Sequence, residues 1–287
     1  MIKIISCFII LSFSWTIGLE ALVIPQKANV ISTSGAGIGG YVDATINPAG
    51  IKYIRPHLGM SDNLWYADIS GIKSSWSFEK KIHRIFSIES IGLDDIEYHV
   101  TNEVDPLGYV DAKWIAFDFS SGINLNKFFK DTRGFSVGYN IKLNYSKLHT
   151  ERYWGYSIDV GLQKKINDKL NFGFVSKNFG REYSLSGIDR IENYIGLGFA
   201  YNANMIRNNI YFDWIYSNSR NIFKLAFKTD FKYVNLALGT SYSKDSYKDF
   251  SYGLSFQIKD WAIIFGSIIH DNSALGTPKS VELKKYF

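Results

Sequence analysis

Apolar and polar side chains alternate without a break in Phe135-Ser136-Val137-Gly138-Tyr139-Asn140-Ile141-Lys142-Leu143-Asn144-Tyr145. Because successive side chains of a β-strand point to opposite faces, this stretch predicts a strand with one apolar and one polar face. The same alternation recurs in residues 156–163, 223–228 and 251–258. The sequence therefore predicts an all-β protein.

Two all-β architectures fit this pattern, a soluble β-sandwich and a transmembrane β-barrel. Strands of soluble proteins centre on about 5–6 residues, whereas the runs here reach about 10–15 residues, long enough to cross a bilayer when tilted. Aromatic residues also cluster near the expected strand ends, as interface girdles require. The clusters are Trp65-Tyr66, Tyr153-Trp154, Tyr211-Phe212 with Trp214, and Tyr286-Phe287. Both observations favour an antiparallel transmembrane β-barrel.

The turns between alternating runs divide the chain into about fourteen strands, an even number as in single-chain bacterial barrels. The expected strands are 58–67, 69–80, 82–91, 112–123, 132–148, 150–166, 168–180, 188–202, 204–217, 220–230, 232–243, 246–259, 260–270 and 278–287. If both barrel ends lie in the periplasm, the longer connections 92–111, 178–187 and 271–277 fall on the outer side.

Composition excludes several classes of protein. A hydrophobic fraction of 46% with 16% aromatic residues is incompatible with a disordered chain. A mean hydropathy of −0.08 argues against a bundle of transmembrane helices, which needs repeated apolar runs of about 20 residues. The net charge of +5 comes without a basic cluster, so we expect no nucleic-acid partner.

Both ends of the chain carry features of an exported protein. Residues 1–21 have the pattern of a cleaved signal peptide, with Lys3 ahead of an apolar stretch and small residues near Ala21. The single cysteine, Cys7, falls within that segment, so the mature chain has none. The terminal Phe287 resembles the signal read by the outer-membrane assembly machinery. We therefore expect the bacterial outer membrane as location, with its lipid and that machinery as partners.

Residues 25–56 do not alternate and are rich in small residues. Asn47-Pro48 predicts a turn, and Gly50 just after it permits a positive φ. The glycine-rich run 35–40 is not a phosphate-binding loop, because no Gly-Lys-Ser/Thr follows it. Small residues allow close backbone packing, which suits a segment folded inside a barrel.

Three motifs in this region resemble the N-terminal signature of the FadL-like outer-membrane barrels, most closely the PorV/PorQ branch. They are Ala36-Gly37-Ile38-Gly39, Asp43-Ala44-Thr45 and Asn47-Pro48-Ala49-Gly50. A second match is residues 155–162 followed by 170–174 and 177–180, an Asp-hydrophobe-Gly-Leu strand and then a strand ending in Asn-hydrophobe-Gly. The resemblance implies fourteen strands in residues 58–287 and a small plug or hatch in residues 22–57. The plug motif would be Gly37, Asp43, Asn47, Pro48, Ala49 and Gly50.

The residues indicate no enzyme. None of the five histidines lies in a hydrolase or metal-binding motif, and the acidic stretch from Asp94 to Asp105 is best explained as a solvated loop. We therefore expect no catalytic residue, metal or cofactor. The polar strand faces suggest lumen-lining residues, which either line a channel or pair with one another. The candidates are Lys142, Asp159, Gln163, Lys224 and Lys228.

The resemblance leaves two functions open. Its PorV/PorQ side implies binding or shuttling of secreted proteins at the outer membrane, as in type IX secretion. Its FadL side implies passive transport of a hydrophobic ligand, which would leave through a lateral gap beside the plug. Polar inward faces and apolar outer-loop residues favour secreted cargo proteins as partners, with hydrophobic transport as the alternative. The outer-loop binding candidates are Leu93, Ile96, Tyr98, Leu107 and Tyr109.

Overall fold

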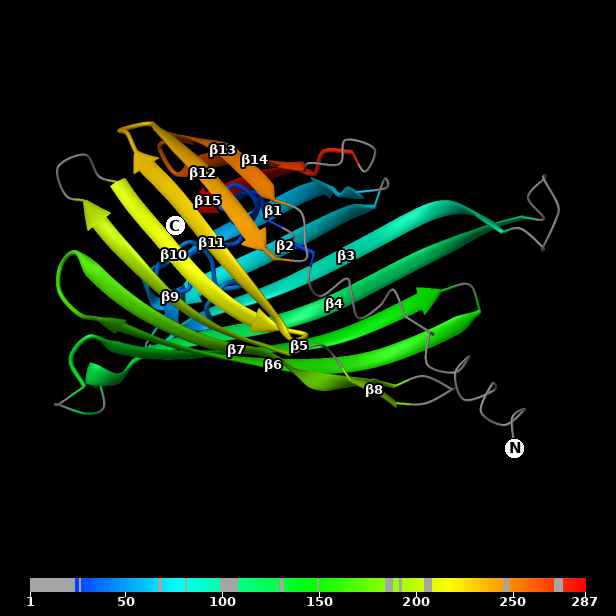
Figure 1. Ribbon diagram of the computed structural model, residues 1–287, viewed down its shortest axis with the longest axis horizontal. Coiled ribbons are helices and arrows are strands. Elements are labelled where there is room, and N and C mark those ends of the chain that lie inside the picture. The colour runs from blue at the N-terminus through cyan, green and yellow to red at the C-terminus, as the bar shows by residue number, and fades with distance from the viewer. Residues whose placement is uncertain are drawn as a thin grey trace.

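A computed structural model of the chain describes residues 24–25, 27–66, 69–80, 82–98, 108–127, 129, 132–148, 150–183, 188–190, 193–203, 208–244, 248–270 and 276–287. Strands dominate it (Figure 1). They are β1 (His57–Leu64), β2 (Ser70–Glu79), β3 (His83–Tyr98), β4 (Gly108–Asn124), β5 (Phe135–Leu148), β6 (Glu151–Lys165), β7 (Leu170–Tyr183), β8 (Ile188–Arg190), β9 (Tyr194–Ala203), β10 (Asn208–Ser217), β11 (Arg220–Asp230), β12 (Val234–Ser243), β13 (Asp249–Ile258), β14 (Trp261–His270) and β15 (Lys279–Tyr286). The helices are short: α3 (Ala28–Ile31), η2 (Pro48–Tyr53) and η4 (Leu125–Lys127).

The strands form one closed antiparallel ring. Apart from β8, each strand pairs with its neighbours in sequence, β7 pairs with β9, and β1 closes the ring by pairing with β15. The three-residue β8 is an addition on the edge of β7, so fourteen of the fifteen strands make the barrel. The prediction of a closed antiparallel barrel of about fourteen strands is confirmed. We call the end that carries Pro56 and Phe287 the terminal rim.

At the opposite end, β3 and β4 project beyond their neighbours as a two-stranded ribbon (Figure 1). Pairing of β2 with β3 stops at Gly92, and pairing of β4 with β5 stops at Ala112. We call this end the ribbon rim. The prediction that residues 92–111 form a loop is wrong, since their described part continues the two strands. The loop expected from Asn178 is also wrong, because β7 continues to Tyr183.

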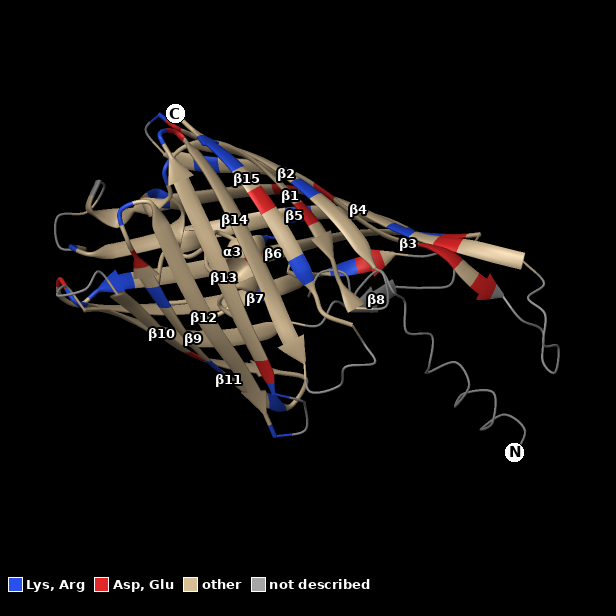
Figure 2. Ribbon diagram, turned by 90° about the horizontal axis from the view of Figure 1, so that it is seen from above, with Lys and Arg blue, Asp and Glu red and all other residues tan. Residues whose placement is uncertain are grey.

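The outward face of the barrel is apolar. Figure 2 shows long uncharged stretches along β9 and β12–β14, with charged residues at the rims, on the ribbon and along β15. Aromatic rings contact each other across strands near the terminal rim, where the ring centroids of Phe86 and Phe119 are 4.8 Å apart. The girdle prediction fails for Tyr153 and Tyr211, whose side chains are buried inside the ring. Both residues occupy inward positions of the alternating pattern. The face on which a residue lies, and not its nearness to a strand end, therefore decides whether it can reach the membrane interface.

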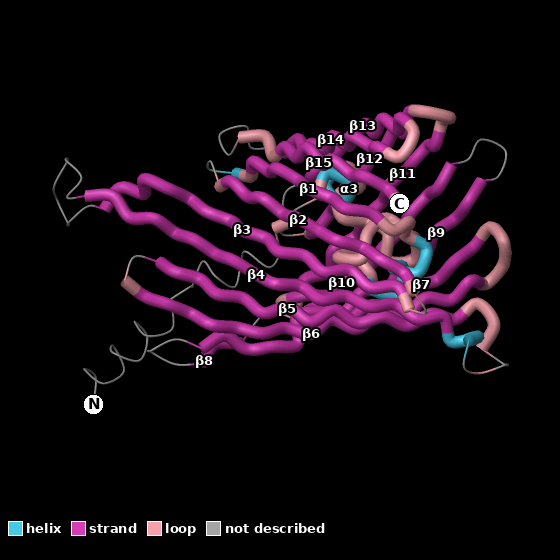
Figure 3. Tube along the Cα trace, turned by 180° about the vertical axis from the view of Figure 1, so that it is seen from behind, coloured by secondary structure: helices cyan, strands magenta, loops and turns pink. Residues whose placement is uncertain are grey.

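The inward face carries small and polar side chains, and residues 24–56 lie against it. We call these residues, apart from the undescribed residue 26, the N-terminal segment. Figure 3 shows α3 inside the ring of strands. The segment reaches the terminal rim, where the Phe287 N–H donates to the Pro56 carbonyl. Within the described part of the chain, no helix combines the length and apolar character needed to cross a membrane.

Candidate functional site: the filled lumen

The N-terminal segment fits inside the barrel because many inward strand positions are glycine. A side chain at Gly138 would overlap the Pro48 backbone, and one at Gly266 would overlap the Ala28 carbonyl. The strand glycines that the segment approaches in this way include Gly138, Gly161, Gly173, Gly198, Gly239, Gly253 and Gly266. The segment therefore contacts strands on opposite sides of the lumen.

Side chains of the barrel wall hold the segment by its backbone. The Asp213 carboxylate of β10 accepts the N–H groups of Gly37 at 2.6 Å and Ile38 at 3.0 Å. The Gln163 amide of β6 donates to the Ile38 carbonyl at 3.0 Å and also to the Gly40 carbonyl. These bonds satisfy backbone groups that are buried away from any regular ladder.

Within the segment, Asn47 organises the turn that the sequence predicts. Its side-chain oxygen accepts the Ala49 N–H at 3.0 Å, while its amide donates to the Ile38 carbonyl at 2.8 Å. Pro48 begins η2, a position that suits proline because no N–H is needed there. Gly50 does not use the positive φ that glycine permits: it lies in η2, and the Gly40 carbonyl is 3.2 Å from where a side chain would begin.

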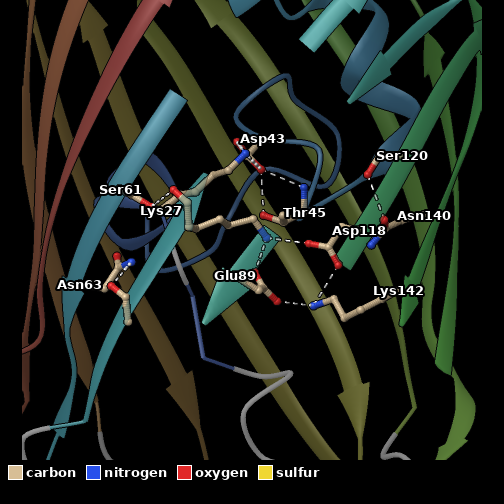
Figure 4. A network of polar contacts seen from close by, with 12 residues as sticks. Lys27, Asp43, Thr45, Ser61, Asn63, Glu89, Asp118, Ser120, Asn140 and Lys142 are labelled. Atoms are coloured by element: carbon tan, nitrogen blue, oxygen red, sulfur yellow. Dashed lines mark hydrogen bonds and ion pairs between the residues drawn. The ribbon is translucent and has the colours of Figure 1, made fainter. Parts of the chain in front are cut away.

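A network of four charged side chains from four adjacent strands lies inside the ring. Figure 4 labels three of them, Glu89, Asp118 and Lys142. Lys73 of β2 pairs with Glu89 of β3 and, at 2.8 Å, with Asp118 of β4. Lys142 of β5 pairs with Glu89 at 3.0 Å and Asp118 at 3.8 Å. Two cations thus neutralise two carboxylates, as buried charges require.

A second ion pair lies within the N-terminal segment. Lys27 and Asp43 are 3.1 Å apart, and each side chain is only 4% exposed. Burial by itself raises the pKa of the Asp43 carboxyl, but the ammonium groups of Lys27 and Lys284 and hydrogen bonds from Thr45 outweigh it. Together they hold the Asp43 pKa well below its usual range, so the Asp43 carboxyl stays ionised at neutral pH.

The wall itself is interrupted beside these charges. The β6–β7 ladder skips between Ile158 and Val160, where Asp159 faces both Lys177 and Asn178. Asn178 has a φ of +62°, and its N–H donates to the Asp159 carboxylate at 2.8 Å. One residue of β6 thus opposes two of β7, which defines a β-bulge.

Two cavities flank the N-terminal segment. The ribbon-side cavity, about 120 Å³, has an apolar wall that includes Ile38, Ile46 and Ile215 and a polar wall of charged side chains. Its polar lining is Lys27, Thr45, Lys73, Glu89, Asn140, Lys142, Asp159, Lys177, Asn178, Tyr194 and Lys224. The terminal-side cavity, about 260 Å³, is lined by residues that include Asn29, Val42, Arg55, Lys228 and Lys284. Each volume is enough for several waters.

The five lumen candidates from the sequence all lie on the inner side of the wall, but they do not form one cluster. Lys142, Asp159 and Lys224 line the ribbon-side cavity, and Lys228 lines the terminal-side cavity. Gln163 instead holds the N-terminal segment. Lys142 pairs with carboxylates, as expected if the polar inward residues pair with one another instead of lining a channel.

The plug-motif candidates lie in the N-terminal segment. Gly37 has a φ of 136°, and the Asn47–Gly50 stretch contacts the inner faces of β4, β5 and β6. The outer-loop candidates fall on the ribbon instead of a loop: Leu93 and Ile96 lie in β3 and Tyr109 in β4. Tyr98 ends β3, and Leu107 lies outside the described residues, as do residues 1–21.

Several central residues were missed from the sequence. Lys73, Glu89, Asp118, Lys177 and Asp213 all sit at inward positions of otherwise regular strands. In the sequence, each is a charged residue on the polar face of an alternating strand. That pattern is the same whether the face lines a water-filled channel or packs against other residues. Asp213 was the most conspicuous, because it lies within the apolar run Tyr211–Ile215.

The side chains of the lumen form ion pairs, hydrogen bonds and apolar contacts. In the parts of the chain that the structure describes, no group of three or more histidine, cysteine or acidic side chains could hold a metal ion. The lumen offers paired charges, hydrogen-bonding amides and one apolar wall, enclosed by a ring whose outside is apolar. This arrangement defines an outer-membrane type of barrel with a filled lumen.

Solved structures with the same architecture are FadL-type outer-membrane barrels. The toluene transporter TbuX of Ralstonia pickettii is 10% identical, with a TM-score of 0.65 over 91% of this chain and 98% of that one. The toluene transporter TodX of Pseudomonas putida is 12% identical, with a TM-score of 0.63 over 91% and 98%. A FadL homologue of Pseudomonas aeruginosa is 10% identical, with a TM-score of 0.56 over 92% and 99%.

These likenesses cover almost the whole length of both chains, and at such low identity they show the fold. No protein-family model matches the sequence, and a search of curated proteins finds no match either. The FadL-like part of the sequence resemblance is thus confirmed for the fold. Two of these neighbours are described as toluene transporters.

Proposed function

We propose that the protein is an outer-membrane barrel through which hydrophobic small molecules pass, with the N-terminal segment as its plug. Three features support this: the fold shared with two toluene transporters, the apolar outer wall, and a lumen filled by residues 24–56. In this arrangement the terminal rim faces the periplasm and the ribbon rim faces outward.

The charged lumen makes an axial route unsuitable for an apolar solute. A molecule moving past Lys27, Asp43 and Lys284 would displace water from charged groups without pairing them, which is costly. A lateral route into the bilayer avoids that cost. It needs a site where the solute can leave the barrel wall.

The β6–β7 bulge carries the proposal, because it interrupts the wall directly between the ribbon-side cavity and the lipid-facing surface. On the inside, Asp159 and Asn178 line the cavity. On the outside, Ile158, Val160 and Phe179 are exposed. An apolar solute held against the apolar wall of the cavity would thus leave between these two strands.

Deleting Asn178 tests the route, because one residue of β7 would then oppose one of β6 and the ladder would close. The measurement is accumulation of radiolabelled toluene by Gram-negative cells that express each variant. We expect the Asn178 deletion to lower accumulation about tenfold, since a closed ladder leaves no exit. Uptake at the wild-type rate in a correctly assembled deletion variant would refute the route.

The chain offers a matched control. The β3–β4 ladder contains a similar bulge between Leu93 and Ile96, but it lies on the ribbon beyond the barrel wall. Deleting Asp95 removes that bulge and should leave toluene accumulation unchanged. A role in protein secretion would instead use the apolar ribbon residues Leu93, Ile96 and Tyr109, so truncating the ribbon would abolish it.

A further inference from the structure

The two cavities lie on opposite sides of the N-terminal segment. In α3, Val30 lines the ribbon-side cavity and its neighbour Asn29 lines the terminal-side cavity. In the return stretch of the segment, Thr45 lines the first and Val42 the second. The same two pieces of chain therefore form the floor of one cavity and the roof of the other.

Two side-chain contacts tie these pieces of chain together. Lys27 pairs with Asp43 at 3.1 Å, and the Asn29 amide donates to the Val42 carbonyl. Thr45 adds hydrogen bonds to Asp43 from its N–H at 2.9 Å and its hydroxyl at 2.8 Å. Figure 4 shows Lys27, Asp43 and Thr45 together beside the Glu89–Asp118–Lys142 network. We call Lys27, Asn29, Val42 and Asp43 the partition.

Each cavity also extends away from the partition toward a rim. The terminal-side cavity reaches Arg55, whose half-exposed side chain pairs with Asp260 on the turn at the terminal rim. The ribbon-side cavity reaches Ile24 and Pro25, which are partly exposed at the other end. The partition is thus the thin layer between two polar spaces aligned along the barrel.

Cations outnumber anions on the cavity walls. Among the described residues, the ribbon-side cavity is lined by five lysines and two carboxylates. The terminal-side cavity is lined by Arg55, Lys228 and Lys284, with no described carboxylate. The carboxylates Asp43, Asp118 and Glu282 are buried and paired with lysines, and they line neither cavity. Pores lined by lysine and arginine favour anions.

We propose that the two cavities are halves of a closed aqueous route along the barrel axis, and that opening the partition lets small hydrophilic anions pass. This route is separate from the lateral path for hydrophobic molecules. It uses Lys27–Asp43 as its closing contact, whereas the lateral path uses the β6–β7 bulge. The barrel would therefore carry two classes of solute by two exits.

Single-channel recording tests the route. Purified wild-type protein and the Asp43→Ala variant are placed in planar bilayers, with potassium chloride at two concentrations across the membrane. Removing the carboxylate leaves the Lys27 ammonium buried without its partner, so water must enter or the segment must move. We expect conductance at least about tenfold above wild type, with a reversal potential of the sign that chloride selectivity gives.

A second pair of variants separates packing from charge. The double variant Lys27→Met with Asp43→Leu keeps the volume of the partition without its charges, so it should stay closed like the wild type. Asn29→Ala removes the other contact without uncovering a charge, and it should raise conductance severalfold. If Asp43→Ala does not assemble, Asn29→Ala decides the question.

Three results would overturn the proposal. The first is an assembled Asp43→Ala or, failing that, Asn29→Ala variant that conducts no more than wild type. The second is an open variant that selects cations. The third is a wild-type protein that already conducts as strongly as Asp43→Ala, because the partition would then close nothing.

Discussion

At the scale of single residues, Asp213 shows how the wall holds the N-terminal segment. Its carboxylate is fully buried and accepts two backbone N–H groups of the segment, from Gly37 and Ile38. Replacing it with alanine leaves both donors without a partner. Each unsatisfied buried group costs about 1–3 kcal/mol. Asp213→Ala should therefore lower the free energy of unfolding several times more than the substitution of a surface residue does.

The measurement is urea-induced unfolding of the protein in lipid vesicles. Asp213→Asn is the matched variant, because its side-chain oxygen still accepts one N–H, and we expect about half the loss. If Asp213→Ala unfolds at the wild-type urea concentration, other contacts alone hold the segment.

The importance of Asp213 could have been suspected from the sequence but its partner could not. An acidic residue between Tyr211 and Ile215 stands out in an apolar run. Its partners lie more than 170 positions earlier in the chain, and nothing in the alternation of β10 points to them. Lys142 and Asp159 were found from the same kind of pattern, yet their partners on β3, β4 and β7 depend on the register between strands, which the alternation does not give.

At the scale of elements, the N-terminal segment and the barrel strands fit because glycines remove side chains where they meet. Gly138→Val should push the segment off β5, since the new side chain would overlap Pro48. We expect an assembled barrel whose N-terminal segment is cut faster by an added protease, by about tenfold or more, because local opening exposes its backbone.

Gly108→Val is the control, because it makes the same change on the ribbon, where nothing lies within 4 Å of the new side chain. Its protease sensitivity should match the wild type. Equal cleavage rates for Gly138→Val and Gly108→Val would show that the close fit does not hold the segment in place.

Most elements follow from the alternation of the sequence, and the exceptions have physical causes. β11 spans residues 220–230, as the sequence predicts. β3 and β4 run longer than expected because the acidic residues Asp94, Asp95 and Glu97 look like loop residues, although a solvated ribbon carries charges on both faces. The path of the N-terminal segment was not predictable in detail, because it has no period and follows the shape of the lumen.

At the scale of the whole molecule, the apolar outer wall should behave as a membrane surface. Leu225 lies near the middle of β11 and points outward, with 48% of its surface exposed. A lysine on the lipid-facing side of a barrel costs about 2–4 kcal/mol at the bilayer midplane and about 0–1 kcal/mol near its surface. Leu225→Lys should therefore lower the free energy of unfolding in vesicles by the larger amount.

Asn221→Lys is the comparison, because Asn221 lies on the same strand near its end. It should cost little or nothing in the same measurement. Equal costs for the two lysine variants would mean that the wall does not face hydrocarbon, and the outer-membrane location would have to be abandoned.

A barrel that carries hydrophobic small molecules should retain one when it is isolated gently. The test is mass spectrometry of the protein extracted from outer membranes, scoring both bound small molecules and co-purifying proteins. We expect a hydrophobic small molecule bound at about one per barrel, and reduced occupancy when the apolar wall of the ribbon-side cavity is made polar by Ile215→Asn. Secreted proteins that share a C-terminal domain, bound in place of such a molecule, would rule out hydrophobic transport as the function.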